Sequence, residues 1–180
     1  MSNHLPDGWT EYSNVGKRIP GTRFIAFKVP LKKVFDTRLA PLQRFSTTEL
    51  ISEIEKQKEE LGFVVDLTCT KRYYSPQELP ATVQYAKIFT AGRQLPTDEV
   101  IYEFKSTVKQ FLSENADNEK LIGVHCTHGL NRTGYLVCRY MIDVLDMVPS
   151  EAIEKFNKSR GHCIERENYL ADLLQGKPRR

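Results

Sequence analysis

The stretch LIGVHCTHGLNRTG, residues 121–134, changes from an apolar, β-branched run into a segment with helical spacing. Leu121–Val124 is typical of a buried strand, and the apolar side chains of 133–145 (TGYLVCRYMIDVL) recur on one helical face. One cysteine, two histidines and an arginine therefore lie on a tight turn from a strand into a helix. This turn, residues 125–132, is called the cysteine turn below.

Similar strand and helix patterns occur on both sides of the turn. Strands are expected at 23–29, 62–68, 86–90 and 120–126, and helices at 50–61, 98–112, 131–146, 150–158 and 165–175. Ser46 and Glu49 form a capping box, and Thr97 caps the second helix. The alternation predicts an α/β domain with a mainly parallel central sheet flanked by helices. Ligands of such sheets bind beyond the carboxyl ends of the strands, where the cysteine turn lies.

A chain of 180 residues suits one domain with a hydrophobic core, and no repeat divides it. We expect a single domain over 1–180, with an extended N-terminal segment at 1–20 and a basic end at 176–180. Lys155–Arg180 holds seven basic and three acidic residues, a net charge of +4, so the rest sums to −1 because the total is +3. This excess indicates either a solvated surface or an anionic partner.

The composition is that of an ordinary soluble protein. No apolar run approaches the ~20 residues that span a membrane, and MSNHLPDGWTEY, residues 1–12, lacks the apolar stretch of a secretory signal. The four cysteines form no C-x-x-C pair, which favours a reduced, intracellular setting without disulfides. Cys69 and Cys138 lie in apolar contexts and are expected to be core thiols.

The cysteine turn combines the parts of an anion-binding, nucleophilic site. A loop that leads into a helix directs several N–H groups at one point, and Gly129 and Asn131 tolerate the positive φ that this requires. Such a nest binds tetrahedral anions, and its field should lower the pKa of the Cys126 thiol well below ~8.5. Arg132 offers a planar fork for two phosphoryl oxygens, and Thr133 a hydroxyl for the sulfur. These residues predict phosphoryl transfer through a phosphocysteine.

A metal site is the rival interpretation of His125, Cys126 and His128. A structural zinc needs four ligands, and the sequence holds no second cluster of cysteine and histidine, so neither metal nor cofactor is expected. His125 is instead expected to orient the loop, and His128 to face either solvent or substrate. The expected phosphate cradle consists of Thr127, His128, Gly129, Leu130, Asn131 and Arg132.

The segment HCTHGLNRTG, residues 125–134, resembles the signature of cysteine-dependent phosphatases. With VVDLTCTKRYY (64–74) and SRGHCIERENY (159–169), it resembles atypical dual-specificity phosphatases akin to baculovirus phosphatase and to the triphosphatase domain of animal mRNA capping enzymes. The resemblance extends over about 5–175 and implies the cysteine-phosphatase fold. It also implies an RNA 5′-triphosphatase that trims triphosphate and diphosphate ends to monophosphate, with weak activity on phosphotyrosine and no metal. A nuclear setting, ribonucleoprotein partners and a monomer are expected on the same ground.

One departure from the family concerns the general acid. Dual-specificity phosphatases carry an aspartate on a loop after a strand, but the matching loop here, TAGRQLP (90–96), has no carboxylate, and Asp98 and Glu99 fall in a predicted first helical turn. A tyrosine leaving group has a pKa of ~10 and gains from protonation. The phosphate chain expelled from a triphosphate has a last pKa of ~6 and leaves without it. The missing acid therefore matters least on a phosphoanhydride. Asp66, at the end of a predicted strand, is the remaining candidate, either as acid or as a carboxylate bonded to loop amides.

Further cations are expected to hold the remaining phosphates or the RNA. The candidates are Arg166, which ranks first, Lys71, Arg72, Arg93 and Arg160. The alternative for each of them is an ordinary surface cation that binds no ligand. Tyr73 and Tyr74 either stack on the first base or belong to the core. Three functions stay open: an RNA 5′-phosphatase, a protein or phosphoinositide phosphatase, and a module that binds phosphorylated RNA ends without turnover. The pairing of Cys126 with Arg132 favours an enzyme.

Overall fold

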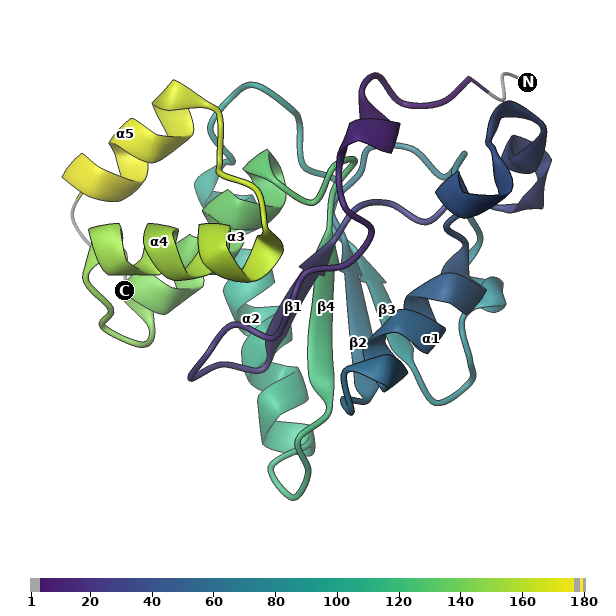
Figure 1. The fold of residues 1–180 in the computed structure, drawn as a ribbon. Helices are drawn as coiled ribbons and strands as arrows, with labels where there is room; N and C mark the ends of the chain where they lie inside the picture. Colours follow the sequence, from purple (N-terminus) through teal and green to yellow (C-terminus); the bar gives the residue numbers. More distant parts are fainter. Residues whose placement is uncertain (1–3, 177–178, 180) are drawn as a thin grey trace.

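The computed structural model describes residues 4–176 and residue 179. A four-stranded parallel sheet lies at its centre, with the strand order β1-β4-β2-β3 (Figure 1). The strands are β1 (Phe24–Phe27), β2 (Leu61–Asp66), β3 (Gln84–Lys87) and β4 (Leu121–His125). The α-helices are α1 (Thr47–Lys56), α2 (Asp98–Glu114), α3 (Asn131–Asp143), α4 (Pro149–Arg160) and α5 (Glu167–Gln175). The predicted parallel sheet flanked by helices is confirmed.

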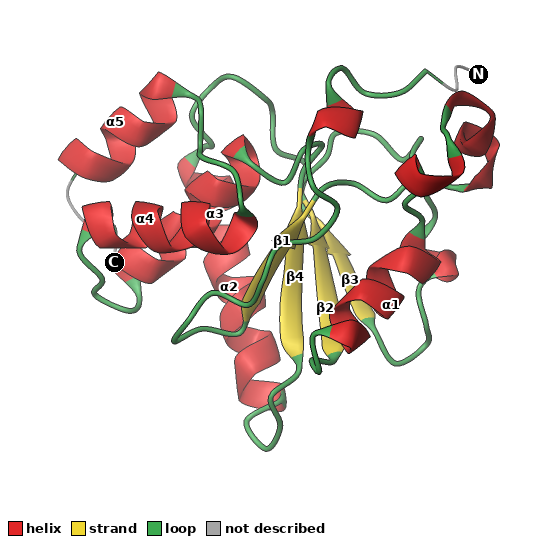
Figure 2. Cartoon of the chain, viewed as in Figure 1, coloured by secondary structure: helices red, strands yellow, loops and turns green. Residues whose placement is uncertain are grey.

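Helices cover both faces of the sheet (Figure 2). Helices α2, α3, α4 and α5 pack on one face, where alternate strand residues such as Phe63, Val65 and Val124 join their core. The other face packs against α1 and the N-terminal segment, through residues such as Phe27 and Val64. Every position of β1, β2 and β4 is buried, which is why these strands read as continuous apolar runs.

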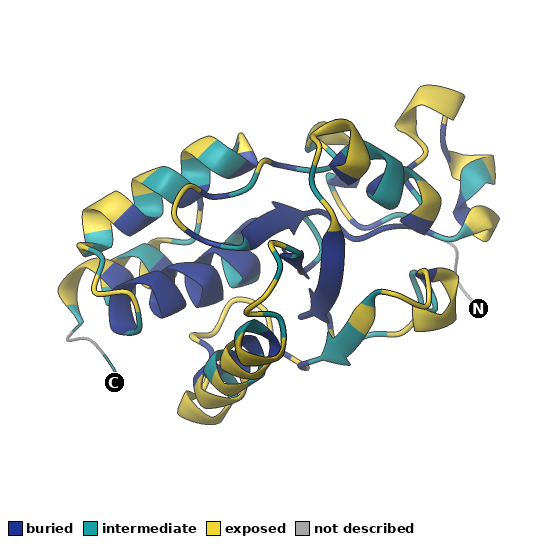
Figure 3. Ribbon diagram, turned by 90° about the horizontal axis from the view of Figure 1, so that it is seen from below, coloured by how far each residue is buried: buried dark blue, intermediate teal, exposed yellow. Residues whose placement is uncertain are grey.

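Helix α3 is the most enclosed helix of the fold, and all its residues from Thr133 to Asp143 are buried (Figure 3). Its two buried charges satisfy each other, because the Arg139 guanidinium donates to both Asp143 carboxylate oxygens at 2.9 and 3.0 Å. Lys105 adds an ion pair to Asp143 at 2.7 Å. The cysteine turn thus leads into a helix that is fixed on all sides by packing and by paired charge.

The structure corrects several expected boundaries. Helix α1 starts with the predicted capping box at Ser46 but ends at Lys56 instead of near Gly62, because Lys58 adopts a left-handed φ of 61°. Strand β3 ends at Lys87, since its register partner Asp66 is the last residue of β2. Phe89, which was expected inside a strand, therefore lies in the following loop and is exposed.

The ends of the chain also differ from the expectation. The N-terminal segment, residues 4–19, contains a 3₁₀-helix at Trp9–Glu11 and buries Trp9 and Ile19, so it is a packed part of the fold. At the basic end, Arg179 pairs with Asp172 at 3.1 Å, while residues 1–3, 177, 178 and 180 lie outside the described part. None of the described helices combines the length and the apolar composition that crossing a membrane requires.

Candidate active site

The cysteine turn joins the carboxyl end of β4 to the first residue of α3. Gly129 has a φ of 71°, and a Cβ atom there would lie 2.2 Å from the carbonyl oxygen of Phe27. Only glycine fits, for conformational and for steric reasons. A backbone hydrogen bond of 3.0 Å from Val29 to the Thr127 carbonyl fixes the turn further against the segment after β1.

Cys126 lies at the base of this turn with its side chain buried. Burial alone would raise the pKa of the thiol, but the Arg132 charge, the Thr133 hydroxyl and the backbone N–H groups of Thr133 and Leu130 lower it below its ordinary value. Thr133 Oγ1 is buried and has no other hydrogen-bond partner in the described part of the chain, so it is available to donate to the sulfur. The site therefore favours a thiolate nucleophile.

The Arg132 guanidinium is held in place from two sides. Its Nη1 donates to the Thr90 carbonyl at 3.0 Å, and its Nη2 donates to Thr127 Oγ1 at 3.0 Å. Thr90 belongs to the loop 90–96, which is the loop without a carboxylate. The cation is thus fixed between that loop and the cysteine turn, close enough to the thiolate to lower its pKa.

His125 lies behind the nucleophile and is fully buried. Its Nδ1 is 2.9 Å from the Cys126 carbonyl, which can only accept, so Nδ1 carries the hydrogen and Nε2 accepts from the Tyr74 hydroxyl at 2.7 Å. Burial lowers the pKa of the imidazole, although the Asp66 charge opposes this. A neutral His125 with these partners supports its expected role of orienting the loop.

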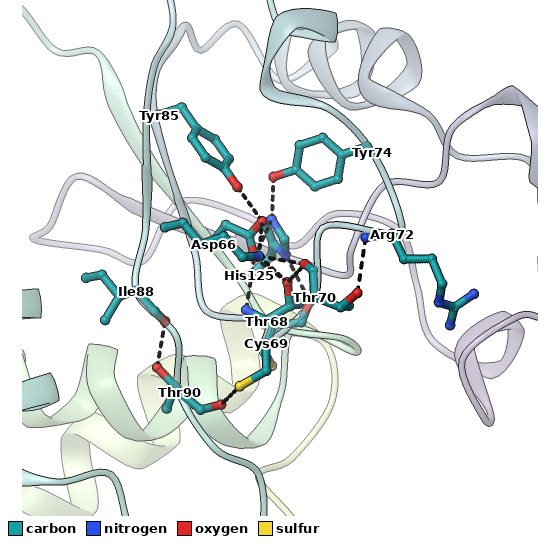
Figure 4. Close-up of polar contacts among 12 residues, drawn as sticks. Asp66, Thr68, Cys69, Thr70, Arg72, Tyr74, Tyr85, Ile88, Thr90 and His125 are labelled. Atoms are coloured by element: carbon teal, nitrogen blue, oxygen red, sulfur yellow. Dashed lines mark hydrogen bonds and ion pairs between the residues drawn. The ribbon is translucent and has the colours of Figure 1, made fainter. Parts of the chain in front are cut away.

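Asp66 lies next to His125 in the polar network of Figure 4. Its carboxylate accepts hydrogen bonds from the Tyr85 hydroxyl at 2.6 Å and from the backbone N–H and hydroxyl of Thr68, and it pairs with Lys87 at 3.1 Å. Burial would raise the pKa of Asp66, but the hydrogen bonds from Tyr85 and Thr68 lower it. These contacts favour the alternative of a positioning residue for Asp66 over that of a general acid.

His128 was expected to face either solvent or substrate, and its half-buried side chain contacts the N-terminal segment. Its Nε2 donates to the Asp7 carbonyl at 2.6 Å, and its ring stacks on Tyr12 at a centroid distance of 4.7 Å. Burial lowers the pKa of this imidazole. The His128 side chain thus connects the cysteine turn to the N-terminal segment.

Arg160 is also placed differently from the expectation, because it is buried beneath the cysteine turn instead of exposed to RNA. Its Nε donates to the Gly129 carbonyl at 3.0 Å, and Nη2 donates to the His128 and Ser13 carbonyls, each at 2.8 Å. Nη1 donates to Ser13 Oγ at 2.8 Å. Burial lowers the pKa of Arg160 to about 10, so it stays charged. This arginine supports the turn and is not a phosphate ligand.

Among the other expected cations, Arg166 makes a hydrogen bond to a residue of the cysteine turn. It is the N-cap residue of α5, and its backbone N–H donates to Asn131 Oδ1 at 3.0 Å. Its guanidinium lies 5.9 Å from the centre of the Tyr169 ring, and its Nε is buried with no partner in the described part of the chain. Its backbone thus contacts the first residue of α3, and a guanidinium with an unpaired donor on such a residue is suited to a second phosphate.

The remaining expected cations have separate surroundings. Lys71 and Arg93 are exposed, and Arg93 has a left-handed φ of 73°. Arg72 donates to the His4 carbonyl at 2.8 Å and lies over the Tyr73 ring at 4.6 Å, so it belongs to the support of the N-terminal segment. Tyr74 is a core residue, since its side chain is buried and its hydroxyl bonds His125.

Cys138 and Cys69 were both expected to be core thiols, and the structure agrees for Cys138 but not for Cys69. Cys138 is buried in α3, and burial raises the pKa of its thiol, as fits a core residue. Cys69 is exposed, with its Sγ donating to the Thr90 carbonyl at 3.2 Å, because the apolar run ends at Leu67 and the chain then enters a loop. Within residues 4–176 and 179, no group of three or more histidine, cysteine, aspartate or glutamate side chains could hold a metal ion.

Sequence reasoning missed the role of Lys28, which follows an apolar run and is buried. Its ammonium donates to the carbonyls of Trp9 and Tyr12 at 3.0 and 2.8 Å and lies 3.6 Å from the centre of the Trp9 ring. Burial lowers the pKa of Lys28 to about 8. A lysine directly after a buried strand, two residues before Pro30, was the available signal.

Residues 45–178 match the family of the dual specificity phosphatase catalytic domain. The human RNA/RNP complex-1-interacting phosphatase is 61% identical over 174 residues, covering 97% of this chain and 53% of the relative. A tyrosine-protein phosphatase of Autographa californica nuclear polyhedrosis virus is 42% identical, covering 94% of this chain and 99% of the relative. This chain thus spans about half the length of the mammalian relatives and nearly all of the viral one.

Solved structures agree at the level of the fold. Tk-PTP in its active form superposes with a TM-score of 0.62 at 19% identity, covering 90% of this chain and 97% of that one. PTPMT1 gives a TM-score of 0.62 at 20% identity, covering 89% and 91%. With the thiolate-favouring turn, the facing arginine and the match over 45–178, these likenesses show that the chain belongs to the dual-specificity phosphatase family.

Proposed function

We propose that this chain removes the γ and β phosphates from the 5′ ends of RNA through a phosphocysteine intermediate. The observation that carries this proposal is the loop 90–96, which contains no carboxylate to protonate the leaving group. The partners of Asp66 lower the pKa of its carboxyl group. A site with a thiolate and no acid suits a leaving group that needs no proton, which a phosphoanhydride supplies.

The reaction proceeds in two displacements. The Cys126 thiolate attacks the terminal phosphorus, an S–P bond forms, and the P–O bond to the next phosphate breaks, so the shortened RNA end leaves as an anion. Water then attacks the phosphocysteine, the S–P bond breaks, and the water proton passes to the departing phosphate or to solvent. In both steps the Arg132 fork and the inward N–H groups of the turn stabilise the charge on the phosphoryl oxygens. The neighbouring Arg166 is placed to hold the phosphate that is not being transferred.

Names of relatives support RNA as the substrate class. The human relative is named for an interaction with an RNA/RNP complex, and we carry this to the present chain as part of the proposal, together with a nuclear location, ribonucleoprotein partners and a monomeric state. The viral relative is named a tyrosine-protein phosphatase. That name favours a second candidate, phosphotyrosine hydrolysis, which the same turn would perform slowly because the phenolate leaves unprotonated.

Phosphate release from triphosphate-ended RNA, compared with a phosphotyrosine peptide, tests the proposal. We expect kcat/KM to be higher for the RNA by at least about 10²-fold, the usual contribution of one general acid. The Cys126→Ser variant is the control, and it should bind both substrates without releasing phosphate. Faster release from the peptide would contradict the proposal and identify a protein phosphatase, and binding without release from either would identify a binding module.

A further inference from the structure

A basic pocket lies beside the cysteine turn, at the carboxyl ends of β2 and β3. Its volume is 420 Å³, and it is lined by Lys32, Lys71, Tyr74, Ser75, Pro76, Gln77, Tyr85 and Lys87. The lining thus holds three lysines and no carboxylate. The Lys87 ammonium is committed to Asp66 and to the Thr70 carbonyl. The ammonium groups of Lys32 and Lys71 have no hydrogen bond or ion pair within residues 4–176 and 179, so this lysine pocket carries uncompensated positive charge.

The lysine pocket connects to the cysteine turn through two sets of contacts. From its lining, the Tyr74 hydroxyl donates to His125, the residue before the nucleophile, at 2.7 Å (Figure 4). Outside the lining, the Phe89 ring lies 5.3 Å from the Lys87 ammonium, and the next residue, Thr90, accepts a hydrogen bond from Arg132. The pocket and Phe89 are thus each joined to the site of the nucleophile through one intervening residue.

Phe89 is a large apolar side chain that the fold leaves uncovered. It is 55% exposed because β3 ends two residues earlier and no further strand covers the loop. An exposed aromatic ring that contacts one lysine of a basic pocket is an arrangement suited to single-stranded nucleic acid, since any base can stack on the ring while the other cations of the pocket hold the backbone. An acidic peptide would use the lysines but not the ring.

We propose that the lysine pocket and Phe89 form a subsite for the first nucleotides of a single-stranded RNA. Phe89 stacks on a base near the 5′ end, and Lys32 and Lys71 bind a phosphodiester that follows it. The subsite rests on the proposed function, because it assigns the course of the RNA that this function places in the turn. It makes the enzyme prefer an RNA chain to a free nucleoside triphosphate, with little preference for sequence.

Kinetics on GTP and on triphosphate-ended RNAs of two, five and ten nucleotides test the stacking role. We expect Phe89→Ala to raise KM for the ten-nucleotide RNA about tenfold, the effect of losing one stacked base, with a smaller change for GTP. A Phe89→Trp variant keeps an aromatic ring for stacking, so it should show the wild-type KM for the RNA. Tyr102→Ala is the matched control, since Tyr102 is 73% exposed on α2 outside the pocket, and it should behave as wild type. An equal change for GTP and RNA, or none for either, would overturn the stacking role.

The lysines are tested through the salt dependence of binding. The Cys126→Ser protein is titrated with a ten-nucleotide RNA that ends in a 5′-hydroxyl, so the result does not depend on phosphate release. We expect the double variant Lys32→Ala and Lys71→Ala to bind more weakly and to flatten the slope of log K against log salt by about 0.7 for each lost contact. The double variant Lys56→Ala and Lys109→Ala removes an equal charge from exposed positions outside the pocket and serves as the control. An unchanged slope in the double variant would overturn the proposal.

These readouts separate the two proposals. If wild-type protein releases no phosphate from RNA yet the 5′-hydroxyl RNA binds in a Phe89- and lysine-dependent manner, the proposed function fails and the subsite stands. If phosphate is released but the variants bind and turn over RNA as wild type, the subsite fails alone. If an oligoglutamate peptide displaces the 5′-hydroxyl RNA as effectively as unlabelled RNA does, the pocket is a site for acidic peptide and the subsite proposal is wrong.

Discussion

Replacing Arg160 by lysine should destabilise the protein and slow phosphate transfer at the same time. The guanidinium makes four hydrogen bonds of 2.8 to 3.0 Å to Ser13, His128 and Gly129, and all are shielded from solvent because the side chain is buried. A lysine ammonium lacks the planar fork and can replace about two of them. Hydrogen bonds to charged groups contribute about 1.5–3 kcal/mol each, so the expected loss of unfolding free energy is about 3–6 kcal/mol.

The effect on catalysis follows from the carbonyl groups that Arg160 holds. Because the carbonyls of His128 and Gly129 point toward the guanidinium, the peptide N–H groups of the turn are free to face the phosphate. Once the carbonyls are released, the turn loses part of this orientation, and kcat on p-nitrophenyl phosphate should fall about 10²-fold, the effect of losing one oxyanion donor.

Urea unfolding and steady-state kinetics measure the two effects. Because a loss of this size could unfold the chain, Ser13→Ala serves as a milder variant that removes the hydrogen bond to Nη1 alone, with an expected loss of about 1 kcal/mol. Arg18→Lys is the matched control, since Arg18 also makes several polar contacts but is partly exposed, and it should lose less than about 1 kcal/mol. Normal kcat and stability in Arg160→Lys would refute the supporting role.

Other predictions concern the cysteine turn and its neighbours. Cys126→Ser should abolish turnover, and an acid-stable protein-bound phosphate that persists in this variant would reject Cys126 as the nucleophile. Iodoacetate should alkylate Cys126 with a midpoint pH below the ~8.5 of a free thiol, in line with its lowered pKa, whereas a midpoint above that value would contradict the thiolate assignment. Arg132→Lys should lose at least about 10²-fold in kcat, since lysine keeps the charge but not the fork; near-normal turnover would exclude bidentate binding. Arg166→Ala should raise KM for triphosphate RNA more than for p-nitrophenyl phosphate, and equal losses on both would place Arg166 in folding or in the chemical step. Activity should persist in excess chelator, and its loss with recovery on adding magnesium or zinc would defeat the metal-free mechanism.

The sequence predicted those parts of the structure that short-range signals determine. The apolar runs indicate the buried strands, the capping box at Ser46 marks the start of α1, and the spacing from Cys126 to Arg132 gives the strand-to-helix turn. Each of these depends on residues within one turn or one strand, where local preferences decide the conformation.

Positions decided by distant contacts could not be predicted in the same way. Arg160 is bonded to a serine 147 residues earlier in the chain, and His128 to a carbonyl 121 residues earlier. A charged residue in the last turn of an amphipathic helix normally faces solvent, so nothing near Arg160 in the sequence signals its burial. Phe89 is the opposite case, since an apolar residue in an apolar run was left outside the sheet when the neighbouring strand ended.

The N-terminal segment has a consequence for how far the catalytic unit extends. The family match begins at residue 45, yet Ser13 binds Arg160 beneath the cysteine turn and the Asp7 carbonyl binds His128 within it. In addition, β1 completes the sheet beside β4. A protein cut at residue 45 would keep every signature residue and lose the edge strand and the anchors of the turn. The piece of chain by which the family is recognised is therefore smaller than the piece that must fold together to hold a reactive thiolate.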